Sequence, residues 1–429
     1  MKTLKAGSGS LERILNAPTK ISGISVDSRK VKKGEVFVAI RGIGSDGHDF
    51  INEAIRRGAA KIYGEKEIKV SGAKYIKVKD SREKLGELAS EFYDNPSQRL
   101  KVIGVTGTKG KTTTCHLIAH ILNHLGQKTK LISTITVAGF HTTTPDVVSL
   151  TKLLKEAVEE GCKYAVVEVS SHGIDQKRIA GVKFAVGVLT NIAPEHLDYH
   201  KTFAEYKRVK YSFINNCRVK IVAKTNTDIN LLPGRFNNLN AQVAVDIVVA
   251  LGYNKQQALE ALHSFELPEG RLDEIKNDLG FKIYIDFAHT PDSLEAVLGY
   301  LKSVTPGRLI SVFGSAGERD PYKRPKMGKI AAEFSDIIIL TAEDPRTEDV
   351  NDIIRQIKSG ISKKYKTVYD IPDRKKAIKY AIKIAKKGDT IAVLGKGHEK
   401  SMNMDGKTET PWSDQEVVKK LLTKNKKIV

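Results

Sequence analysis

The stretch Arg99-Leu-Lys-Val-Ile-Gly-Val-Thr-Gly-Thr-Lys-Gly-Lys-Thr-Thr-Thr114 joins a strand signal, a glycine-rich loop and a helix start. Val102 to Thr106 is an apolar, β-branched run, which predicts a buried strand. The glycines of Gly107-Thr-Lys-Gly-Lys111 permit a tight loop of inward-pointing backbone amides. Beyond Thr112, apolar residues recur at i, i+3, i+4 and i+7, which predicts an amphipathic helix. These residues are Ile118, Ile121, Leu122 and Leu125.

This loop has the chemistry of a phosphate cradle. Backbone amides and the helix dipole would hold phosphate oxygens, Lys111 would bridge the β and γ phosphates, and Thr112 would ligate Mg²⁺. The standard pattern G-x-x-x-x-G-K-[ST] requires glycine at position 105, where this chain has Val105. A glycine-rich turn of a structural βα unit is the alternative, and the flanking strand and helix favour the nucleotide site. The predicted ATP-binding residues of the loop are Gly107, Thr108, Lys109, Gly110, Lys111, Thr112 and Thr113.

Length and composition fit a large folded protein. The chain has 429 residues and 40% apolar content, which supports about three domains with packed cores. No stretch approaches the roughly 18 apolar residues of a membrane span, and Met1 to Asn16 lacks the apolar segment of a secretion signal. Cys115, Cys162 and Cys217 are far apart and form neither a disulfide framework nor a zinc pattern. These features predict a cytoplasmic protein without a membrane partner.

The net charge of +21 raises the question of nucleic-acid binding. Lysine supplies most of the 71 basic residues and is spread along the chain rather than gathered with aromatic residues. Recognition of phosphates and bases depends more on arginine and stacked rings. A lysine-rich solvated surface is therefore favoured and no nucleic-acid partner is expected, while a basic P-loop ATPase that binds nucleic acid remains the competing class.

Three units follow one another along the chain. Residues 1–98 end at the turn cluster Asp94-Asn-Pro-Ser97. Residues 99–270 alternate strand and helix signals, and residues 271–429 alternate again, which predicts an α/β fold of parallel sheets with helices on both faces. The expected strands are 34–40, 61–63, 75–78, 102–106, 130–136, 164–169, 185–189, 219–223, 282–286, 309–313, 337–341 and 390–394. The expected helices are 50–58, 112–125, 150–160, 292–303, 349–364 and 373–387.

Two polar positions after strands are candidates for metal chemistry. Glu168 lies near the end of a buried-looking strand, where ligands of α/β sheets bind, so it could reach a Mg²⁺ held by Thr112. The alternative is a carboxylate that caps a neighbouring helix. His196 and His200 have i, i+4 spacing, but the sequence offers no third zinc ligand nearby. A satisfied polar role for His196 stays equally open.

Longer motifs give the chain a specific resemblance. Val167-Glu-Val-Ser-Ser-His-Gly-Ile-Asp-Gln-Lys-Arg178 is followed by His196-Leu-Asp-Tyr-His200 and Glu205-Tyr-Lys-Arg-Val-Lys210. Asp286-Phe-Ala-His-Thr-Pro-Asp292 and Gly395-Lys-Gly-His-Glu399 come later. In this order, and over the whole chain, they resemble the Mur ligase family, ATP-dependent enzymes that join an amino acid to a carboxylate. The likeness is greatest to the members that complete a UDP-linked muramoyl tripeptide.

The resemblance implies three domains. They are a small α/β UDP-precursor-binding domain at 1–98, a central P-loop ATP-binding domain with a parallel sheet at 99–270, and a Rossmann-like amino-acid-binding domain at 271–429. The further nucleotide contacts that it implies are Asn237, Asn240, Arg271 and Asp286. The implied contacts to the UDP-linked acceptor are Ser28, Arg29, Thr143, Thr144, Ser170, Gln176 and Arg178.

The resemblance also implies the catalytic set. Lys210 matches a lysine that family members carbamylate, which turns a cation into an anionic oxygen ligand. Such a ligand would hold a second Mg²⁺ together with His196, so the implied cofactors are ATP and two Mg²⁺ ions. The implied catalytic residues are Lys111, Glu168, His196 and Lys210, and the implied metal ligands are Thr112, Glu168, His196 and Lys210.

The incoming amino acid is expected at the third unit, at Arg319, Asp344, Arg346, Gly395 and Glu399. The arginines would clamp carboxylates and Glu399 would take an ammonium. Asp344 stands where members that add diaminopimelate carry asparagine, so lysine, diaminopimelate or a similar residue stays open. An ordinary loop ion pair is the alternative for Arg346. The compact length and lysine-rich composition also suit archaeal pseudomurein peptide ligases, so the acceptor stays open too.

The resemblance therefore implies a three-domain ligase that adds an amino acid to a UDP-linked peptide precursor of the cell wall through an acyl phosphate. The expected partners are that precursor and the free amino acid, and a monomer is expected. Folylpolyglutamate synthetase is an alternative with the same central domain. It lacks a UDP-binding first domain and usually shows Gly-Lys-Gly-Ser, whereas this chain has Val26-Asp-Ser-Arg29 and Gly110-Lys-Thr-Thr113. A catalytically idle scaffold is a third possibility, against which the intact catalytic set argues.

Overall fold

The computed structural model describes residues 21–42, 44–136, 142–365 and 367–425, which form two compact units. Unit 1 contains the described part of Met1–Leu100 with Thr144–Gly161 and His172–Lys183. Unit 2 contains the described parts of Lys101–Thr143, Cys162–Ser171 and Phe184–Val429. Met1 to Asn16, where the sequence shows no apolar segment of a secretion signal, lie outside the described residues. Within them, no helix is long and apolar enough to cross a membrane.

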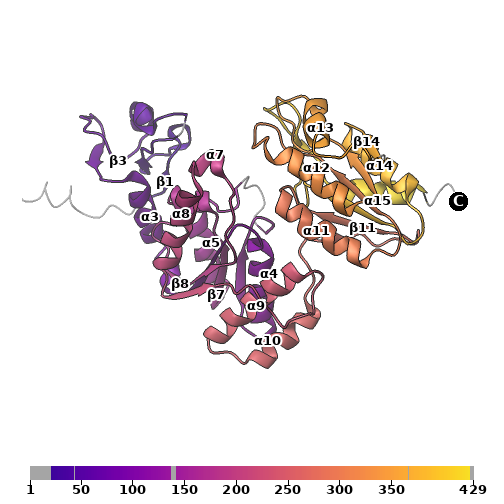
Figure 1. The fold of residues 1–429 in the computed structure, drawn as a ribbon. Coiled ribbons are helices and arrows are strands. Elements are labelled where there is room, and N and C mark those ends of the chain that lie inside the picture. The colour runs from indigo at the N-terminus through magenta and orange to yellow at the C-terminus, as the bar shows by residue number, and fades with distance from the viewer. Residues whose placement is uncertain (1–20, 43, 137–141, 366, 426–429) are drawn as a thin grey trace, which may run out of the picture. The chain divides into compact units, whose positions relative to one another are not determined.

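Unit 1 is built on a four-stranded parallel sheet in the order β1-β2-β3-β4. This early part of the described chain is drawn in indigo and purple in Figure 1. Alternate residues of β2 serve two cores: Phe37 packs beside Ile62 on one face, and Val36 and Val38 pack beside Leu85 on the other. The strands are β1 (Ile24–Ser25), β2 (Val36–Val38), β3 (Lys61–Gly64) and β4 (Lys74–Lys77). The helices are α2 (Ile51–Arg56), α3 (Ser81–Phe92) and α5 (Val147–Glu159), with 3-10 turns at Ser28–Lys30, Gly47–Phe50 and Pro96–Gln98.

Two segments from further along the chain, Thr144–Gly161 and His172–Lys183, complete unit 1. Gly86 of α3 lies so close to the backbone of Ala180 that a Cβ on the glycine would come within 2.5 Å of it. Ser90 Oγ donates to the Gly181 carbonyl at 3.3 Å. Helix α5 also packs against α3. The described residues between 21 and 100 therefore share one packed body with residues that follow much later in the chain.

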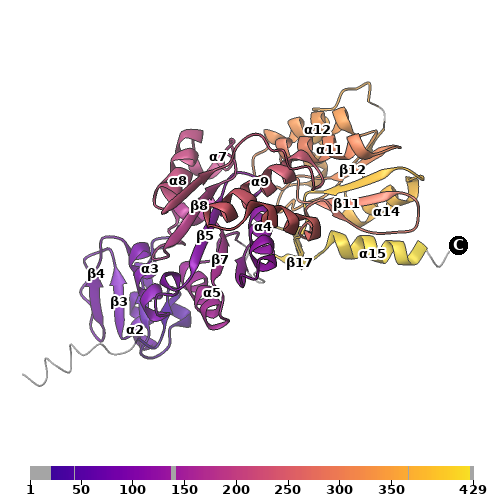
Figure 2. The same ribbon diagram turned by 90° about the horizontal axis from the view of Figure 1, so that it is seen from below.

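The middle part of the chain forms a five-stranded parallel sheet in unit 2, in the order β6-β7-β5-β8-β9. The chain order reverses at the central β5, so ligands are expected beyond its carboxyl end. Helices α4 and α9 pack side by side over one face (Figure 2). The strands are β5 (Lys101–Thr106), β6 (Thr129–Ile132), β7 (Tyr164–Glu168), β8 (Phe184–Leu189) and β9 (Val219–Val222). The helices are α4 (Lys111–His124), α7 (Leu197–His200), α8 (Phe203–Asn215), α9 (Arg235–Ala250) and α10 (Lys255–Ala261), with a 3-10 turn at Leu262–Ser264. Helix α6 (Ser171–Asp175) follows β7 in the chain and belongs to unit 1 except for its first residue.

The last part forms a six-stranded sheet in the order β10-β11-β15-β12-β13-β14, parallel except for β10. Ile310 and Val312 join the core beneath α14 and α15, and Leu309 and Phe313 join the core of α11, α12 and α13. The strands are β10 (Asp273–Glu274), β11 (Lys282–Asp286), β12 (Leu309–Phe313), β13 (Ile337–Leu340), β14 (Val368–Asp370) and β15 (Thr390–Leu394), plus the hairpin β16 (Ser401–Asn403) and β17 (Glu409–Pro411). The helices are α11 (Pro291–Val304), α12 (Lys323–Phe334), α13 (Val350–Lys358), α14 (Arg374–Ile384) and α15 (Asp414–Asn425). The predicted α/β class with parallel sheets is confirmed.

Candidate active site

The loop between β5 and α4 needs glycine at two positions. Gly110 has φ 80°, and a Cβ there would overlap the Asn240 side chain. A Cβ on Gly107 would overlap Thr190 Oγ1. Val105, which replaces the glycine of the standard pattern, is a buried residue inside β5. The strand therefore continues past the usual loop start, and the loop itself is short.

Residues after β8 hold this loop in place. Thr190 Oγ1 and Asn191 Nδ2 donate to the Lys109 carbonyl at 2.6 and 2.9 Å. Asn191 Oδ1 accepts the Lys109 amide at 2.9 Å, and the Asn191 carbonyl accepts the Thr108 amide at 3.0 Å. The loop conformation is thus fixed by the protein itself, which lowers the ordering cost of binding an anion.

Lys111 folds back over the loop from the start of α4. Its Nζ donates to the carbonyls of Gly107 and Thr108, each at 3.0 Å. Burial lowers the pKa of Lys111, while Glu168 and Glu195 act in the opposite direction. A nearby anion would favour the charged ammonium. The position of this amine therefore suits contact with phosphate oxygens.

Glu168 lies at the end of β7, next to Thr112. Thr112 Oγ1 donates to Glu168 Oε1 at 3.0 Å, and the Thr134 amide and hydroxyl donate to Oε2 at 3.1 and 3.0 Å. A hydroxyl and a carboxylate are hard oxygen donors of the kind that Mg²⁺ prefers, so these residues fit that ion. No three His, Cys, Asp or Glu side chains form a metal-holding group in the described chain. A Mg²⁺ ion at Thr112 and Glu168 would need further oxygens, as ATP phosphates supply.

Lys210 of α8 is buried at the base of the same loop, with 1% of its surface exposed. Its Nζ donates to the Gly107 carbonyl at 2.8 Å and to Thr106 Oγ1 at 3.3 Å, and lies 4.8 Å from the centroid of the Tyr206 ring. Burial and the nearby Lys111 hold the pKa of Lys210 well below its usual value. This placement differs from that of an ordinary surface lysine.

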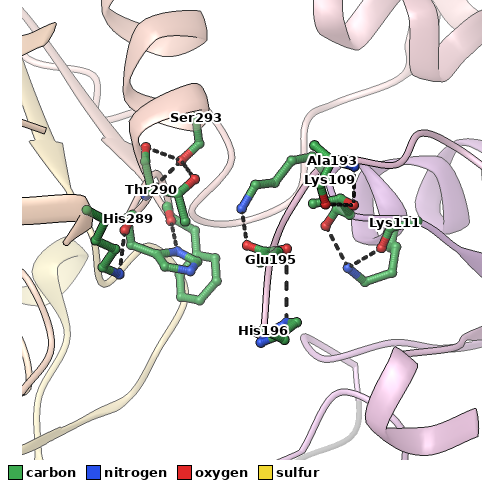
Figure 3. Close-up of polar contacts among 12 residues, drawn as sticks. Lys109, Lys111, Ala193, Glu195, His196, His289, Thr290 and Ser293 are labelled. Carbon is green, nitrogen blue, oxygen red and sulfur yellow. Dashed lines mark hydrogen bonds and ion pairs between the residues drawn. The ribbon is translucent and has the colours of Figure 1, made fainter. Parts of the chain in front are cut away.

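Glu195 connects the loop to His196. Lys109 Nζ pairs with Glu195 Oε1, and His196 Nε2 lies 4.0 Å from Glu195 Oε2 (Figure 3). Burial alone would raise the pKa of the Glu195 carboxyl, but Lys109 and Lys111 lower it to about 2. Sequence reasoning missed Glu195. Its place directly before His196 was the only signal available for it in the sequence. His196 itself has φ 57° and precedes α7.

A cavity of about 2040 Å³ in unit 2 brings many of the predicted residues together. The phosphate loop lines it together with the nucleotide residues of α9, Asn237 and Asn240. Asn237 Nδ2 donates to the Pro233 carbonyl at 2.8 Å. The remaining predicted residues of its lining are Thr143, Glu168, His196, Arg271, Asp286, Arg319, Asp344, Arg346 and Glu399. The cavity therefore combines a phosphate site with charged groups of the last sheet.

Arg271 and Asp286 contribute from the start of the last sheet. Arg271 Nη2 donates to Thr112 Oγ1 at 3.4 Å, and its guanidinium stacks 4.8 Å from the Phe287 ring centroid. The Asp286 carboxylate accepts the amides of Leu272 and Ala288 at 2.7 and 2.8 Å. Burial raises the pKa of Asp286, although Arg271 acts against that. Arg271 is thus the group of this pair that faces the phosphate loop.

The predicted amino-acid residues meet around Lys396, which is 1% exposed. Its Nζ donates to both Asp344 carboxylate oxygens at 2.8 and 2.9 Å and pairs with Glu399 Oε2 at 2.6 Å. Asp344 Oδ1 also accepts the Asn403 amide at 3.0 Å. The charge of Asp344, at the position where the sequence departs from asparagine, is therefore paired with Lys396. Sequence reasoning did not single out this lysine, although it lies inside the Gly395–Glu399 motif.

The two arginines differ in their surroundings. Arg346 has φ 53°, and its Nη1 donates to the Gly317 carbonyl at 2.6 Å. Arg319 is more than half exposed and lies 4.0 Å from Asp198. Gly395 has φ 107° and turns the chain directly after β15. Arg346 is therefore the better fixed of the two arginines.

Five of the predicted acceptor residues belong to unit 1, namely Ser28, Arg29, Thr144, Gln176 and Arg178. Arg178 Nη1 donates to the Thr144 carbonyl at 3.0 Å, and Arg178 Nη2 donates to Gln176 Oε1 at 2.7 Å. Ser28 Oγ donates to Glu53 Oε2 at 2.5 Å, and Arg29 pairs with Asp27 at 2.9 Å. Thr143 and Ser170 belong to unit 2. The predicted acceptor set is thus divided between the two units.

Comparison with known proteins covers nearly the whole chain. Models described as "Mur ligase family, catalytic domain", "Mur ligase middle domain" and "Mur ligase, glutamate ligase domain" match residues 20–93, 105–272 and 270–397. The UDP-N-acetylmuramoyl-L-alanyl-D-glutamate--2,6-diaminopimelate ligases of Aquifex aeolicus and Cytophaga hutchinsonii are 39% and 38% identical to it. Each alignment covers 94% of both chains.

Solved structures agree in fold. A UDP-N-acetylmuramoyl-L-alanyl-D-glutamate--2,6-diaminopimelate ligase has a TM-score of 0.62 at 28% identity, with 95% of each chain covered. The MurF ligase of Thermotoga maritima with ADP has a TM-score of 0.66 at 20% identity, over 96% of this chain and 100% of that one, which bears on the fold alone. The phosphate loop, the sheets and the relatives agree, and the chain belongs to the Mur ligase family of ATP-dependent amide-bond ligases.

Proposed function

We propose that this enzyme joins 2,6-diaminopimelate to the glutamate carboxylate of UDP-N-acetylmuramoyl-L-alanyl-D-glutamate with consumption of ATP. The relatives named above carry out this reaction according to their names. The observation that carries the proposal is the cavity that Lys111, Thr112 and Glu168 share with Arg346 and Glu399. It offers a place for a triphosphate and a place for a zwitterionic amino acid.

The reaction would proceed in two displacements. A carboxylate oxygen of the acceptor attacks the γ-phosphorus, ADP leaves, and an acyl phosphate forms. The amine of the amino acid then attacks the acyl carbon, the C–N bond forms, phosphate leaves and the amine gives up a proton. Lys111 and Arg271 would stabilise the negative charge that crowds around the γ-phosphate, and the fixed loop would hold the phosphates in line.

Thr112 and Glu168 would hold one Mg²⁺ ion, which would offset the repulsion between carboxylate and triphosphate. Carbamylated Lys210 and His196 would hold a second. Carbamylation needs an uncharged amine, and the burial of Lys210 beside Lys111 favours that form. The resulting carbamate would be an anion next to Lys111, which supplies a charge partner.

The amino acid would lie beyond the carboxyl ends of β13 and β15. Arg346 is suited to a carboxylate of diaminopimelate, and Glu399 to an ammonium. Because Lys396 balances Asp344, the change from asparagine to aspartate leaves Arg346 able to attract that carboxylate. Lysine, which has no second carboxylate, would leave Arg346 without this contact.

The remaining assignments follow from this reaction. The domain boundaries would be 98/99 and 270/271, and Ser28, Arg29, Thr143, Thr144, Ser170, Gln176 and Arg178 would bind the UDP-linked acceptor. The enzyme would act as a monomer without nucleic acid, because the proposed catalytic groups are all present on one chain. A cytoplasmic location would give it access to ATP and to UDP-linked precursors.

The test is phosphate release from Mg-ATP across a matrix of substrates. The acceptors are the murein UDP-dipeptide and a pseudomurein-type UDP-peptide, and the amino acids are diaminopimelate, lysine, alanine and glutamate. We expect release, with a ligated product by mass spectrometry, only for the murein acceptor with diaminopimelate. Release that ignores both substrates and rises with DNA or RNA would overturn the proposal, and release with another pair would correct the substrate.

A further inference from the structure

We propose that the buried ion pair Arg374–Asp414 is the positioning device of the amino-acid site. Both side chains have 0% exposure. Arg374 Nε and Nη2 donate to Asp414 Oδ1 and Oδ2 at 2.8 and 2.6 Å. The remaining contacts of the guanidinium go to two strand ends, and these contacts carry the argument. The inference rests on the proposed function, since it concerns the groups assigned there to the amino acid.

The guanidinium joins the ends of two strands that are not neighbours. Arg374 Nη1 donates to the Ala342 carbonyl at 3.1 Å, just beyond β13. Arg374 Nη2 donates to the Leu394 carbonyl at 2.9 Å, the last residue of β15. Strand β12 lies between β13 and β15 and pairs with both, up to Leu340 of β13 and Val393 of β15. Beyond these residues the planar fork of Arg374 holds the two strand ends at a fixed spacing.

The amino-acid site begins directly after these two carbonyls. Glu343 and Asp344 follow Ala342, and Gly395 and Lys396 follow Leu394. An ion pair between Lys396 and Asp344, with an N–O distance of 2.8 Å, then joins the segments that follow the two strands. A shift of either strand end would move the carboxylates that surround Lys396, including Glu399. The clamp therefore sets where the charges of the site stand.

Asp414 is itself fixed from a third side. Trp412 Nε1 donates to Asp414 Oδ1 at 2.8 Å, and Asp414 is the first residue of α15. The pair lies at the N-termini of α14 and α15, whose apolar residues form the core on that face of the sheet. Buried ion pairs of this kind contribute little net stability compared with apolar residues of similar volume. A role in fixing geometry accounts for charge at this place better than a role in stability does.

Arg374→Lys is the test variant, because it keeps the charge and loses the fork. We expect the KM for the amino acid to rise about tenfold or more, since a displacement of 1 Å at an active site costs up to about 100-fold. We also expect the preference for diaminopimelate over lysine to fall, with the KM values for ATP and the UDP-linked acceptor changed less than about twofold. Trp412→Phe removes one hydrogen bond from the clamp while keeping an aromatic side chain at that position, and it should shift the same constants by a smaller factor.

The control is Arg308→Lys at the opposite end of the sheet. Arg308 pairs with the buried Asp389 at 2.6 Å and donates to the Ile384 carbonyl at 2.8 Å, next to the starts of β12 and β15. We expect a lower Tm and unchanged amino-acid constants. A lower Tm in Arg374→Lys or Trp412→Phe with unchanged amino-acid KM and preference would overturn the positioning role. The wild type is assayed first with the amino-acid panel, and KM is then measured for the residue it uses. Failure of the proposed substrate is thereby separated from failure of the clamp.

Discussion

Gly110→Ala should both destabilise the central sheet and weaken ATP binding. At φ 80° an alanine enters the left-handed region, at a cost of about 1–2 kcal/mol. The added Cβ also overlaps the Asn240 side chain, which must leave its position. A displaced rotamer costs about 0.5–1.5 kcal/mol. The free energy of opening α4 should therefore fall by about 1.5–3.5 kcal/mol in total.

Gly126 at the end of α4 provides a matched control. Its φ is 71°, close to that of Gly110, and nothing lies within 4 Å of a Cβ built there. Gly126→Ala should therefore cost only the left-handed term of about 1–2 kcal/mol. Native-state hydrogen exchange of α4 amides measures both variants. Calorimetric titration with ATP should show a Kd raised about tenfold or more for Gly110→Ala, which corresponds to about 1.4 kcal/mol, and no change for Gly126→Ala.

A double variant isolates the overlap. In an Asn240→Ala background, Gly110→Ala should lose the rotamer cost and keep the left-handed cost. The two substitutions should then be coupled by about 0.5–1.5 kcal/mol. Equal costs of Gly110→Ala in both backgrounds would refute the steric reasoning.

Three further outcomes are expected. Lys111→Ala should lower kcat by about 10²-fold or more, because it removes charge stabilisation at the phosphates. Lys379→Ala, on the exposed side of α14, should leave turnover unchanged. Equal turnover in the wild type and both variants would exclude the ligase mechanism. ¹³C NMR after equilibration with ¹³CO₂ should show a carbamate signal that disappears in Lys210→Arg, and a spectrum without that signal would exclude the modification. Burial raises the pKa of Glu399 from 4.5 to about 7, so the KM for the amino acid should rise as the pH falls below 7, while the contribution of Glu399 to folding stability should decrease as the pH rises from 4.5 to 7. Glu399→Gln should remove both pH dependences. If they persist in this variant, they belong to another group.

The parts of the fold with strong local signals were predictable. The strand expected at 102–106 is β5, Lys101–Thr106, because a β-branched run before glycines allows few other structures. Helices α9 and α12 were not predicted. The sequence of α12 contains Pro325 and Gly328, and its helix is held by packing against α11 and α13. The helix expected at 349–364 ends at Lys358, where Gly360 lies against the Pro325 carbonyl. In each case contacts between distant segments decided the structure, and these do not appear in local periodicity.

The site shows the same division. Lys111 and Thr112 were proposed from a motif whose spacing encodes its geometry, and Glu168 from its place at the end of a strand. The burial of Lys210 did not, because one lysine on an amphipathic helix resembles any other until the helix is docked. The pairing of Asp344 with Lys396 joins positions 52 residues apart. Nothing near either residue in the sequence indicates that its charge is already matched.

Unit 1 is assembled from separate segments of the chain, and this has a consequence for synthesis on the ribosome. Its sheet and α3 are translated early, but the surface of α3 at Gly86 and Ser90 is covered by residues 180–181. At about 5–20 residues per second, that cover emerges several seconds after α3. During this interval the nascent unit exposes a surface that belongs in its interior, and the intervening β5, α4 and β6 are already being made. Completion of the N-terminal body therefore waits for the central sheet, so the two must mature together rather than in strict order from the N-terminus.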